Sequence, residues 1–77
     1  MQERCRYSVS VMRDGMYLVT RMTGKGNRVL PTTLDRNEFI EYFSGGTITK
    51  IVGTTCEKIL QELDTRRRGS FEAIEER

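Results

Sequence analysis

The sequence predicts a small α+β domain in which an antiparallel sheet of three to four strands packs two helices on one face. Three observations predict this fold. Alternating, β-rich segments flank Asp14-Gly15, two later segments carry helix-capping residues and apolar stripes, and a short segment rich in Thr, Ile and Val lies between those helices. The predicted element order is βββαβα, in one domain over residues 1–69. Residues 70–77 are short and charged, and we expect them to form a C-terminal tail.

The first two strands are predicted from the segments on either side of Asp14-Gly15. Asp-Gly between alternating segments favours a two-residue type I′ turn, because both central residues of that turn need positive φ. This turn would pair Val11 with Leu18 and Val9 with Thr20. One face of the hairpin is then apolar, as expected for a face that packs on helices. The opposite, exposed face would carry Ser8, Ser10, Met12, Tyr17, Val19 and Arg21.

A short third strand is predicted at residues 28–30, after a glycine-rich loop at residues 23–27. Pro31 follows this strand directly. Because proline cannot donate a hydrogen bond to a neighbouring strand, it occurs at a strand end or on an edge strand. We therefore expect the third strand to end at Leu30.

The first helix is predicted to begin after Asp35 and to end near Ser44. Asp35 as the N-cap and Glu38 three residues later have the spacing of a capping box. Gly45-Gly46 follows, and glycine is favoured where a helix ends in the left-handed region. The capping residues thus place both ends of this helix.

The second helix is predicted over about residues 55–67, with Thr54 to Glu57 as its capping box and Gly69 at its end. Residues 47–52, between the helices, leave two alternatives. Their β-branched composition and flanking glycines favour a strand. Their apolar spacing instead fits one long C-terminal helix, with the order βββαα. We prefer the strand, because a run of β-branched residues disfavours a helix.

These elements predict one small core. A chain of 77 residues buries only about 60% of the surface that its unfolded form exposes, so a partner often supplements a core of this size. The expected core residues face inward in the predicted register or lie on the helix stripes. They are Tyr7, Val9, Val11, Leu18, Leu30, Phe39, Ile40, Phe43, Ile48, Val52, Ile59, Leu60 and Leu63.

The composition argues against catalysis and metal binding. The chain has no histidine, so the commonest general base and a usual zinc ligand are absent. We expect no catalytic residue, no metal and no cofactor. Cys5 and Cys56 are expected as reduced thiols in a cytoplasmic protein, with a disulfide as the alternative, because no signal peptide precedes the fold. No apolar run approaches the roughly 20 residues of a membrane span.

Charge is segregated along the chain, although the net charge is only +2. Residues 1–34 are basic and residues 35–65 are acidic. A basic hairpin and the consecutive Arg66 to Arg68 would suit an anionic partner, either an acidic protein surface or phosphates. Ordinary solvated charge, with Arg66 to Arg68 stabilising the helix end, is the alternative.

The exposed hairpin face indicates a binding role. Tyr, Met and Arg are the residue types enriched at protein interfaces, although single exposed apolar residues are common on any surface. We therefore predict a non-catalytic protein-binding module whose partner is another protein, a host complex or a second copy of this chain. Nucleic acid is the alternative ligand. The predicted partner-binding residues are Met12, Tyr17, Val19, Arg21, Arg66, Arg67 and Arg68.

Two resemblances accompany this interpretation. The N-terminal half, with Tyr7-Ser-Val-Ser-Val, Arg13-Asp-Gly, Tyr17-Leu-Val-Thr-Arg21 and a helix from Asp35 to Phe43, resembles the three-strand-plus-helix module of phage integrase arm-binding and AP2-type domains. Those domains lay their sheet in the DNA major groove. The resemblance implies that the DNA contacts would be Arg6, Arg21, Lys25 and Arg28.

The order of elements along the whole chain also resembles small phage-encoded inhibitor proteins, notably some type I-F anti-CRISPR proteins. The likeness lies in a sheet followed by the Asp35 to Phe43 helix, the link Ser44-Gly-Gly and a last helix that ends in Arg66 to Arg68. Such proteins cover a surface on a host complex without chemistry. This resemblance implies a non-enzymatic inhibitor.

Overall fold

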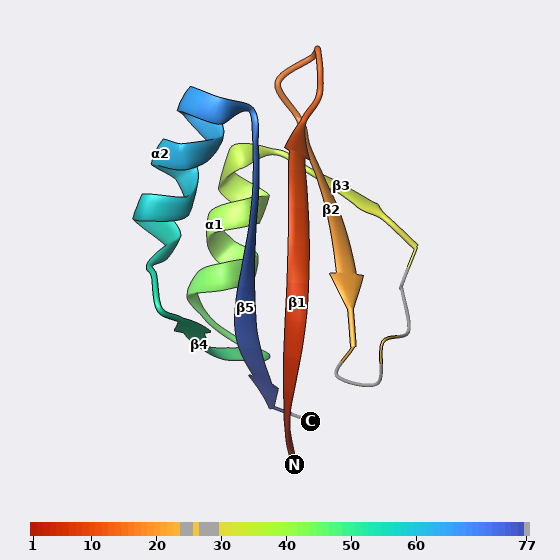
Figure 1. The fold of residues 1–77 in the computed structure, drawn as a ribbon, viewed down its shortest axis with the longest axis vertical. Coiled ribbons are helices and arrows are strands. Elements are labelled where there is room, and N and C mark those ends of the chain that lie inside the picture. Colours follow the sequence, from red (N-terminus) through yellow and green to blue (C-terminus); the bar gives the residue numbers. More distant parts are fainter. Residues whose placement is uncertain (24–25, 27–29, 77) are drawn as a thin grey trace.

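The computed structural model describes residues 1–23, 26 and 30–76 of the chain. It confirms the α+β class, but the antiparallel sheet has five strands and the element order is βββαβαβ (Figure 1). The strands lie in the order β3-β2-β1-β5-β4, so the first and last strands of the chain are neighbours. The elements are β1 (Gln2–Val11), β2 (Tyr17–Met22), β3 (Thr32–Leu34), α1 (Arg36–Ser44), β4 (Ile48–Val52), α2 (Cys56–Arg66) and β5 (Arg68–Glu76).

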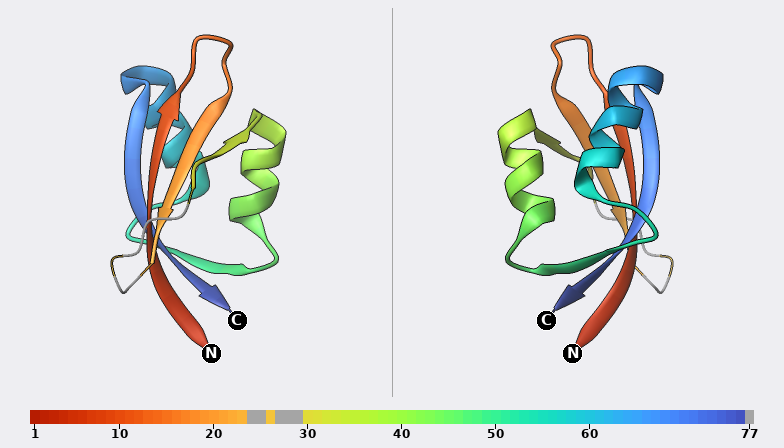
Figure 2. Two further views of the ribbon diagram at one scale, coloured as in Figure 1. Left: turned by 90° about the vertical axis from the view of Figure 1, so that its right-hand side faces the viewer. Right: turned by 90° about the vertical axis from the view of Figure 1, so that its left-hand side faces the viewer.

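One core joins the sheet to both helices. In Figure 2 the long strands β1 and β5 curve side by side, with α2 packed against them and α1 closer to β3 and β4. The inward side chains of the sheet share this core with the apolar residues of both helices. The predicted core residues that are buried are Tyr7, Val9, Phe39, Phe43, Ile48, Ile59, Leu60 and Leu63.

The hairpin turn differs from the prediction by one residue. The Met12 amide donates to the Met16 carbonyl at 2.8 Å, and the Gly15 amide donates to the Met12 carbonyl at 3.0 Å. Only Gly15, at φ 87°, has positive φ in the loop. The predicted two-residue type I′ turn is therefore wrong, because Arg13, Asp14 and Gly15 together form a three-residue loop. The Asp14 carboxylate accepts a hydrogen bond from the Met16 amide at 3.0 Å and supports this loop.

This extra loop residue reverses the faces of β2. Val11 pairs with Tyr17 and Val9 pairs with Val19, not with Leu18 and Thr20. Because side chains alternate along a strand, a shift of one residue moves every side chain to the other face. Tyr17 and Val19 are consequently buried, and Leu18 lies half-buried on the outer face.

The third strand also lies elsewhere. Leu30 belongs to no strand and is 86% exposed, so its predicted place in the core is wrong. The strand begins after Pro31 and pairs Tyr17 with Leu34. Proline still precedes the hydrogen-bonded ladder, as its missing N–H requires. The predicted strand residues Arg28 and Val29 lie outside the described residues.

The capping box of α1 is confirmed. The Asp35 carboxylate accepts from the Glu38 amide at 2.8 Å, and the Glu38 carboxylate accepts from the Asp35 amide at 2.9 Å. Gly46 follows the helix with φ 66°, as expected for glycine beyond a helix end. The predicted burial of Ile40 is wrong, because this side chain is 38% exposed.

Both ends of α2 differ slightly from the prediction. The N-cap is Thr55, not Thr54, and its hydroxyl accepts from the Lys58 amide at 3.2 Å. The left-handed residue at the other end is Arg67, at φ 63°, and not Gly69. Gly69 instead lies within β5, because the chain reverses into that strand immediately after the helix.

The strand predicted between the helices is confirmed as β4, which excludes the single long C-terminal helix. The ladder of β4 is irregular between Ile48 and Lys50. This irregularity changes which residues face inward, as a bulge does. Ile51 therefore packs against the core, and the predicted burial of Val52 is wrong.

The predicted tail at residues 70–77 is wrong for the residues that the structure describes. Residues 70–76 belong to β5, which pairs with β1 and with β4. Phe71, Ala73 and Glu75 alternate on its buried face. The sequence did not predict this strand, because a glutamate lies on its buried face and the buried face of a strand is normally apolar. The core also contains residues that the sequence did not predict to be buried, namely Cys5, Tyr17, Val19, Phe71 and Ala73.

Candidate functional site

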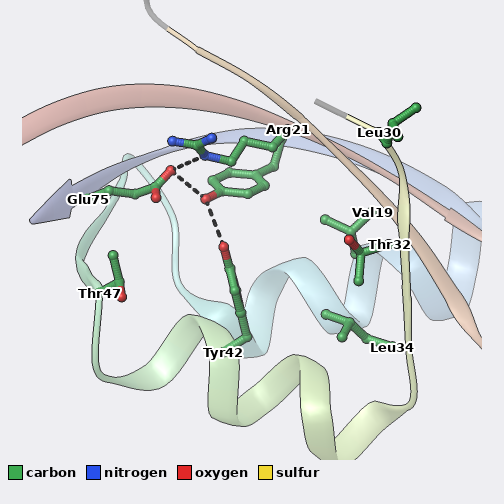
Figure 3. Close-up of a pocket in the computed structure, with 9 residues that line it drawn as sticks. Val19, Arg21, Leu30, Thr32, Leu34, Tyr42, Thr47 and Glu75 are labelled. Atoms are coloured by element: carbon green, nitrogen blue, oxygen red, sulfur yellow. Dashed lines mark hydrogen bonds and ion pairs between the residues drawn. The ribbon is translucent and has the colours of Figure 1, made fainter. Parts of the chain in front are cut away.

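Arg21, a predicted surface contact, lies inside the molecule in a buried polar cluster (Figure 3). Its Nε donates to the Glu75 carboxylate at 2.5 Å, and the Tyr7 hydroxyl donates to the same carboxylate oxygen at 2.7 Å. Glu75 is only 4% exposed. The Tyr42 hydroxyl lies 3.5 Å from that of Tyr7 and extends the cluster toward the surface. These side chains tie β1, β2, β5 and α1 together.

The electrostatics of this polar cluster keep the ion pair charged. Burial alone would raise the pKa of Glu75. The hydrogen bonds that its carboxylate receives from Cys5, Arg21 and Tyr7 outweigh burial, so the pKa of Glu75 lies below its usual range. Burial, with hydrogen bonds to Tyr42 and Glu75, raises the pKa of Tyr7 and keeps the phenol neutral. This arrangement supports the fold and leaves only 17% of the Arg21 side chain exposed.

Two further predicted contacts, Tyr17 and Val19, are also buried. The Tyr17 ring packs on Phe39 of α1 at a centroid distance of 5.1 Å, and its hydroxyl accepts from Arg36 at 3.3 Å. The prediction that these side chains face water is therefore wrong, for the same one-residue shift of register. Lys25 and Arg28, predicted for nucleic acid, lie outside the described residues.

The remaining predicted contacts gather at one end of the molecule. We call this surface the hairpin end and define it as Met12, Arg13, Arg66, Arg67 and Arg68. The Val11 amide donates to the Arg67 carbonyl at 2.9 Å, and Ser10 pairs with Arg68. All five side chains of the hairpin end are exposed, Met12 by 37%. None of its arginines forms an ion pair with another described residue.

A hollow of about 330 Å³ lies beside the hairpin end. Arg66 and Arg68 line it, and the Glu62 carboxylate lines it as well. Because serine side chains are short, groups bound there could approach the backbone closely. The serines that line this hollow are Ser8, Ser10 and Ser70.

The outer face of the sheet extends from this end. Arg6 is exposed there, whereas Arg4 is paired with Glu72 through a 2.7 Å hydrogen bond. Leu18 and Met22 are half-buried apolar residues on the same face. Among the described residues, no aromatic side chain lies on the outer face, since the tyrosines and phenylalanines of the strands point into the core. The face therefore carries Arg6 and Arg68 together with the acidic Glu72 and Glu76, with hydroxyl and apolar groups between the charges.

A second concave region was not predicted from the sequence. Two hollows, of about 480 Å³ and about 540 Å³, share the lining residues Leu34, Tyr42 and Thr47. We call this region the Tyr42 groove. In Figure 3, Tyr42 projects from α1 into one hollow, and Val19 and Leu34 lie across from it. Its residues come from distant parts of the chain, so no local sequence signal indicated it.

The described part of the chain lacks two features, a cluster of metal-ligating side chains and a membrane-spanning helix. It contains no cluster of three or more side chains of the kinds that ligate metals. None of its helices has the length and apolar character that crossing a bilayer requires. The cysteines are free thiols, with Cys5 buried and Cys56 half-buried.

Comparisons with known proteins found no match among protein-family models, curated proteins or solved structures. The geometry of this chain is therefore the main basis for a functional proposal.

Proposed function

We propose that this protein is a small non-catalytic binding module that docks on an acidic surface of another protein through its hairpin end. The observation that carries the proposal is the exposure of four arginines beside Met12, without ion pairs to the described residues. The four arginines are Arg13, Arg66, Arg67 and Arg68.

The composition of the hairpin end supports a protein partner. Arginine and methionine are enriched at protein interfaces, where arginine also binds carboxylates through two parallel hydrogen bonds. The backbone hydrogen bond from Val11 to Arg67 holds the loop beside the end of α2. Such a pre-ordered surface loses less conformational entropy on binding than a flexible one. With the resemblance to anti-CRISPR proteins, we propose that the partner belongs to a host complex and is inhibited by coverage.

Nucleic acid is the second candidate ligand, and the hollow between Arg66 and Arg68 favours it. Arginine and serine side chains are frequent donors to phosphate oxygens. Two features weigh against it. The Glu62 carboxylate also lines the hollow, and the outer face offers no described aromatic side chain on which a base could stack.

The test compares two matched variants of the tagged protein in extract from the organism that carries the gene. Arg66→Ala with Arg68→Ala removes two positive charges at the hairpin end. Lys50→Ala with Lys58→Ala removes two positive charges elsewhere, from exposed positions on β4 and α2. The captured protein is identified, purified and titrated against each variant by calorimetry, with nuclease present throughout.

The proposal predicts a protein partner that survives nuclease treatment and binds the Arg66/Arg68 variant at least about tenfold more weakly. The Lys50/Lys58 variant should bind like the wild type. Binding that disappears with nuclease would favour the nucleic-acid alternative. Equal binding by both variants, or no captured protein, would contradict the proposal.

A further inference from the structure

The Tyr42 groove is a second concave surface, separate from the hairpin end. Its two hollows meet at Leu34, Tyr42 and Thr47. Each hollow lies within the range of about 300–1,000 Å³ that is typical of ligand pockets. No residue of the hairpin end lines either of them. The groove can therefore be tested independently of the proposed function.

The lining of the Tyr42 groove includes apolar side chains that are partly exposed. Leu30 is 86% exposed and Tyr42 is 41% exposed, although both are large hydrophobic residues. Leu34 and the buried Val19 continue this lining. Because Tyr42 packs edge-on against Tyr7 and Phe43, its ring is held in place. A fixed aromatic ring beside aliphatic side chains suits an apolar side chain of a partner.

The charges around the groove are mainly negative. Glu38 and Glu41 of α1 line one hollow and are both exposed, and Glu75 lines the other. Arg21 is the single described cation in either lining, and it is already paired with Glu75 at 2.5 Å. The exposed carboxylates of Glu38 and Glu41 therefore face solvent without a described cation in the groove. This charge is opposite to that of the hairpin end.

We propose that the Tyr42 groove binds a basic peptide segment of a partner protein, with one large apolar side chain seated against Tyr42 and flanking lysines or arginines near Glu38 and Glu41. The apolar side chain supplies most of the affinity, because its burial removes the exposed surface of Leu30 and Tyr42 from water. The flanking lysines or arginines of the peptide provide specificity, since exposed charge pairs contribute more to specificity than to affinity.

The experiment selects a library of random peptides displayed on phage against the folded wild-type protein. A synthetic peptide with the consensus of the selected sequences is then titrated by fluorescence anisotropy against four variants. Tyr42→Ala and Leu30→Ser each remove an apolar side chain from the residues that line the groove, and Leu30→Ser should not affect folding because Leu30 is exposed. Glu38→Gln with Glu41→Gln removes the rim charge, and glutamine can still serve in the capping box. Glu57→Gln with Glu62→Gln is the matched control on α2.

The proposal predicts selected peptides with one Leu, Phe or Trp between lysines or arginines. Tyr42→Ala and Leu30→Ser should each weaken the consensus peptide by about tenfold. The Glu38/Glu41 variant should weaken it and reduce its salt dependence, while the Glu57/Glu62 control and the Arg66/Arg68 variant should bind like the wild type. Acidic or neutral selected peptides, no selected peptide, or binding unchanged by Leu30→Ser would overturn the proposal. Self-association that Leu30→Ser abolishes would make a second copy the occupant and would overturn it too.

Discussion

Arg21 and Arg68 lie on opposite faces of the same sheet, and their surroundings differ sharply. Arg21 on β2 points inward and donates to the buried carboxylate of Glu75 at 2.5 Å. Arg68 on β5 points outward beside a hollow, with no ion pair to a described residue. The difference shows that one guanidinium group is part of the fold while the other is available for binding. The face of the strand decides between these roles, and residue type does not.

The largest expected effect on stability comes from removing the buried partner of Arg21. Glu75→Gln removes the buried carboxylate that the Arg21 Nε contacts and leaves the guanidinium only its weaker ion pair with Glu3, at 3.6 Å. Removing one partner of a buried pair usually costs about 3 kcal/mol or more of stability. We expect a loss of about 3 kcal/mol in the free energy of unfolding, measured by urea denaturation. Glu76→Gln on the same strand is the control, because Glu76 is exposed, and should change stability by less than about 0.5 kcal/mol.

A double variant measures how strongly Arg21 and Glu75 interact with each other. Arg21→Met alone leaves the Glu75 carboxylate buried, whereas Arg21→Met with Glu75→Leu removes both charges. The double variant should be more stable than either Arg21→Met or Glu75→Leu alone, because well-packed apolar groups avoid the desolvation cost of an unpaired charge. Strictly additive losses would indicate that the two side chains do not act as a pair.

A smaller effect should appear in the pH dependence of stability. The pKa of Glu75 is lower in the folded protein than its usual value, so the unfolded chain binds a proton at this group first as pH falls. The stability that Glu75 contributes is complete above the unfolded pKa of about 4.3 and is lost as pH falls through the lower, folded pKa. Wild-type stability should therefore fall more steeply in acid than that of Glu75→Gln. Parallel curves from urea titrations would refute this expectation.

The smallest expected effect on stability comes from removing the exposed arginines. Arg66→Ala with Arg68→Ala removes side chains that make no described ion pair. Arg66 lies in the last turn of α2, where a positive charge favours the helix dipole, so we expect a loss of less than about 1 kcal/mol. A loss as large as that of Glu75→Gln, measured in the same urea titrations, would mean that these arginines are structural.

Local signals in the sequence predicted the elements well where the determining residues are close together. Asp35 and Glu38 form the predicted capping box, and residues 48–52 form the predicted strand. The Asp14-Gly15 pair also predicted a turn correctly. It could not decide the loop length, because Asp-Gly suits both a two-residue loop and a three-residue loop that needs positive φ only at glycine. Strand β2 has apolar residues on both faces, so its pattern did not choose the register either.

The long-range features of the fold and the site could not be predicted in this way. Glu75 is acceptable inside only because Arg21, 54 residues earlier, reaches it. Without that partner, residues 70–77 resemble a charged tail. The Tyr42 groove has the same origin, since α1, β2, β3 and β5 each contribute to its lining. Of the predicted contacts, Met12 and Arg66 to Arg68 are exposed, because they lie at a turn and a helix end that local signals identify.

The buried face of β2 decides whether Arg21 points into the core, and proton NMR can determine which face is buried. Met12 and Met16 form the hydrogen-bonded pair that closes the loop, so the next pair, Val11 and Tyr17, and then Val9 and Val19, lie closest across the strands. We predict strong nuclear Overhauser effects between the Hα protons of Val9 and Val19, and between those of Val11 and Tyr17. Corresponding signals between Val9 and Thr20 would contradict the account, because Arg21 would then face the solvent.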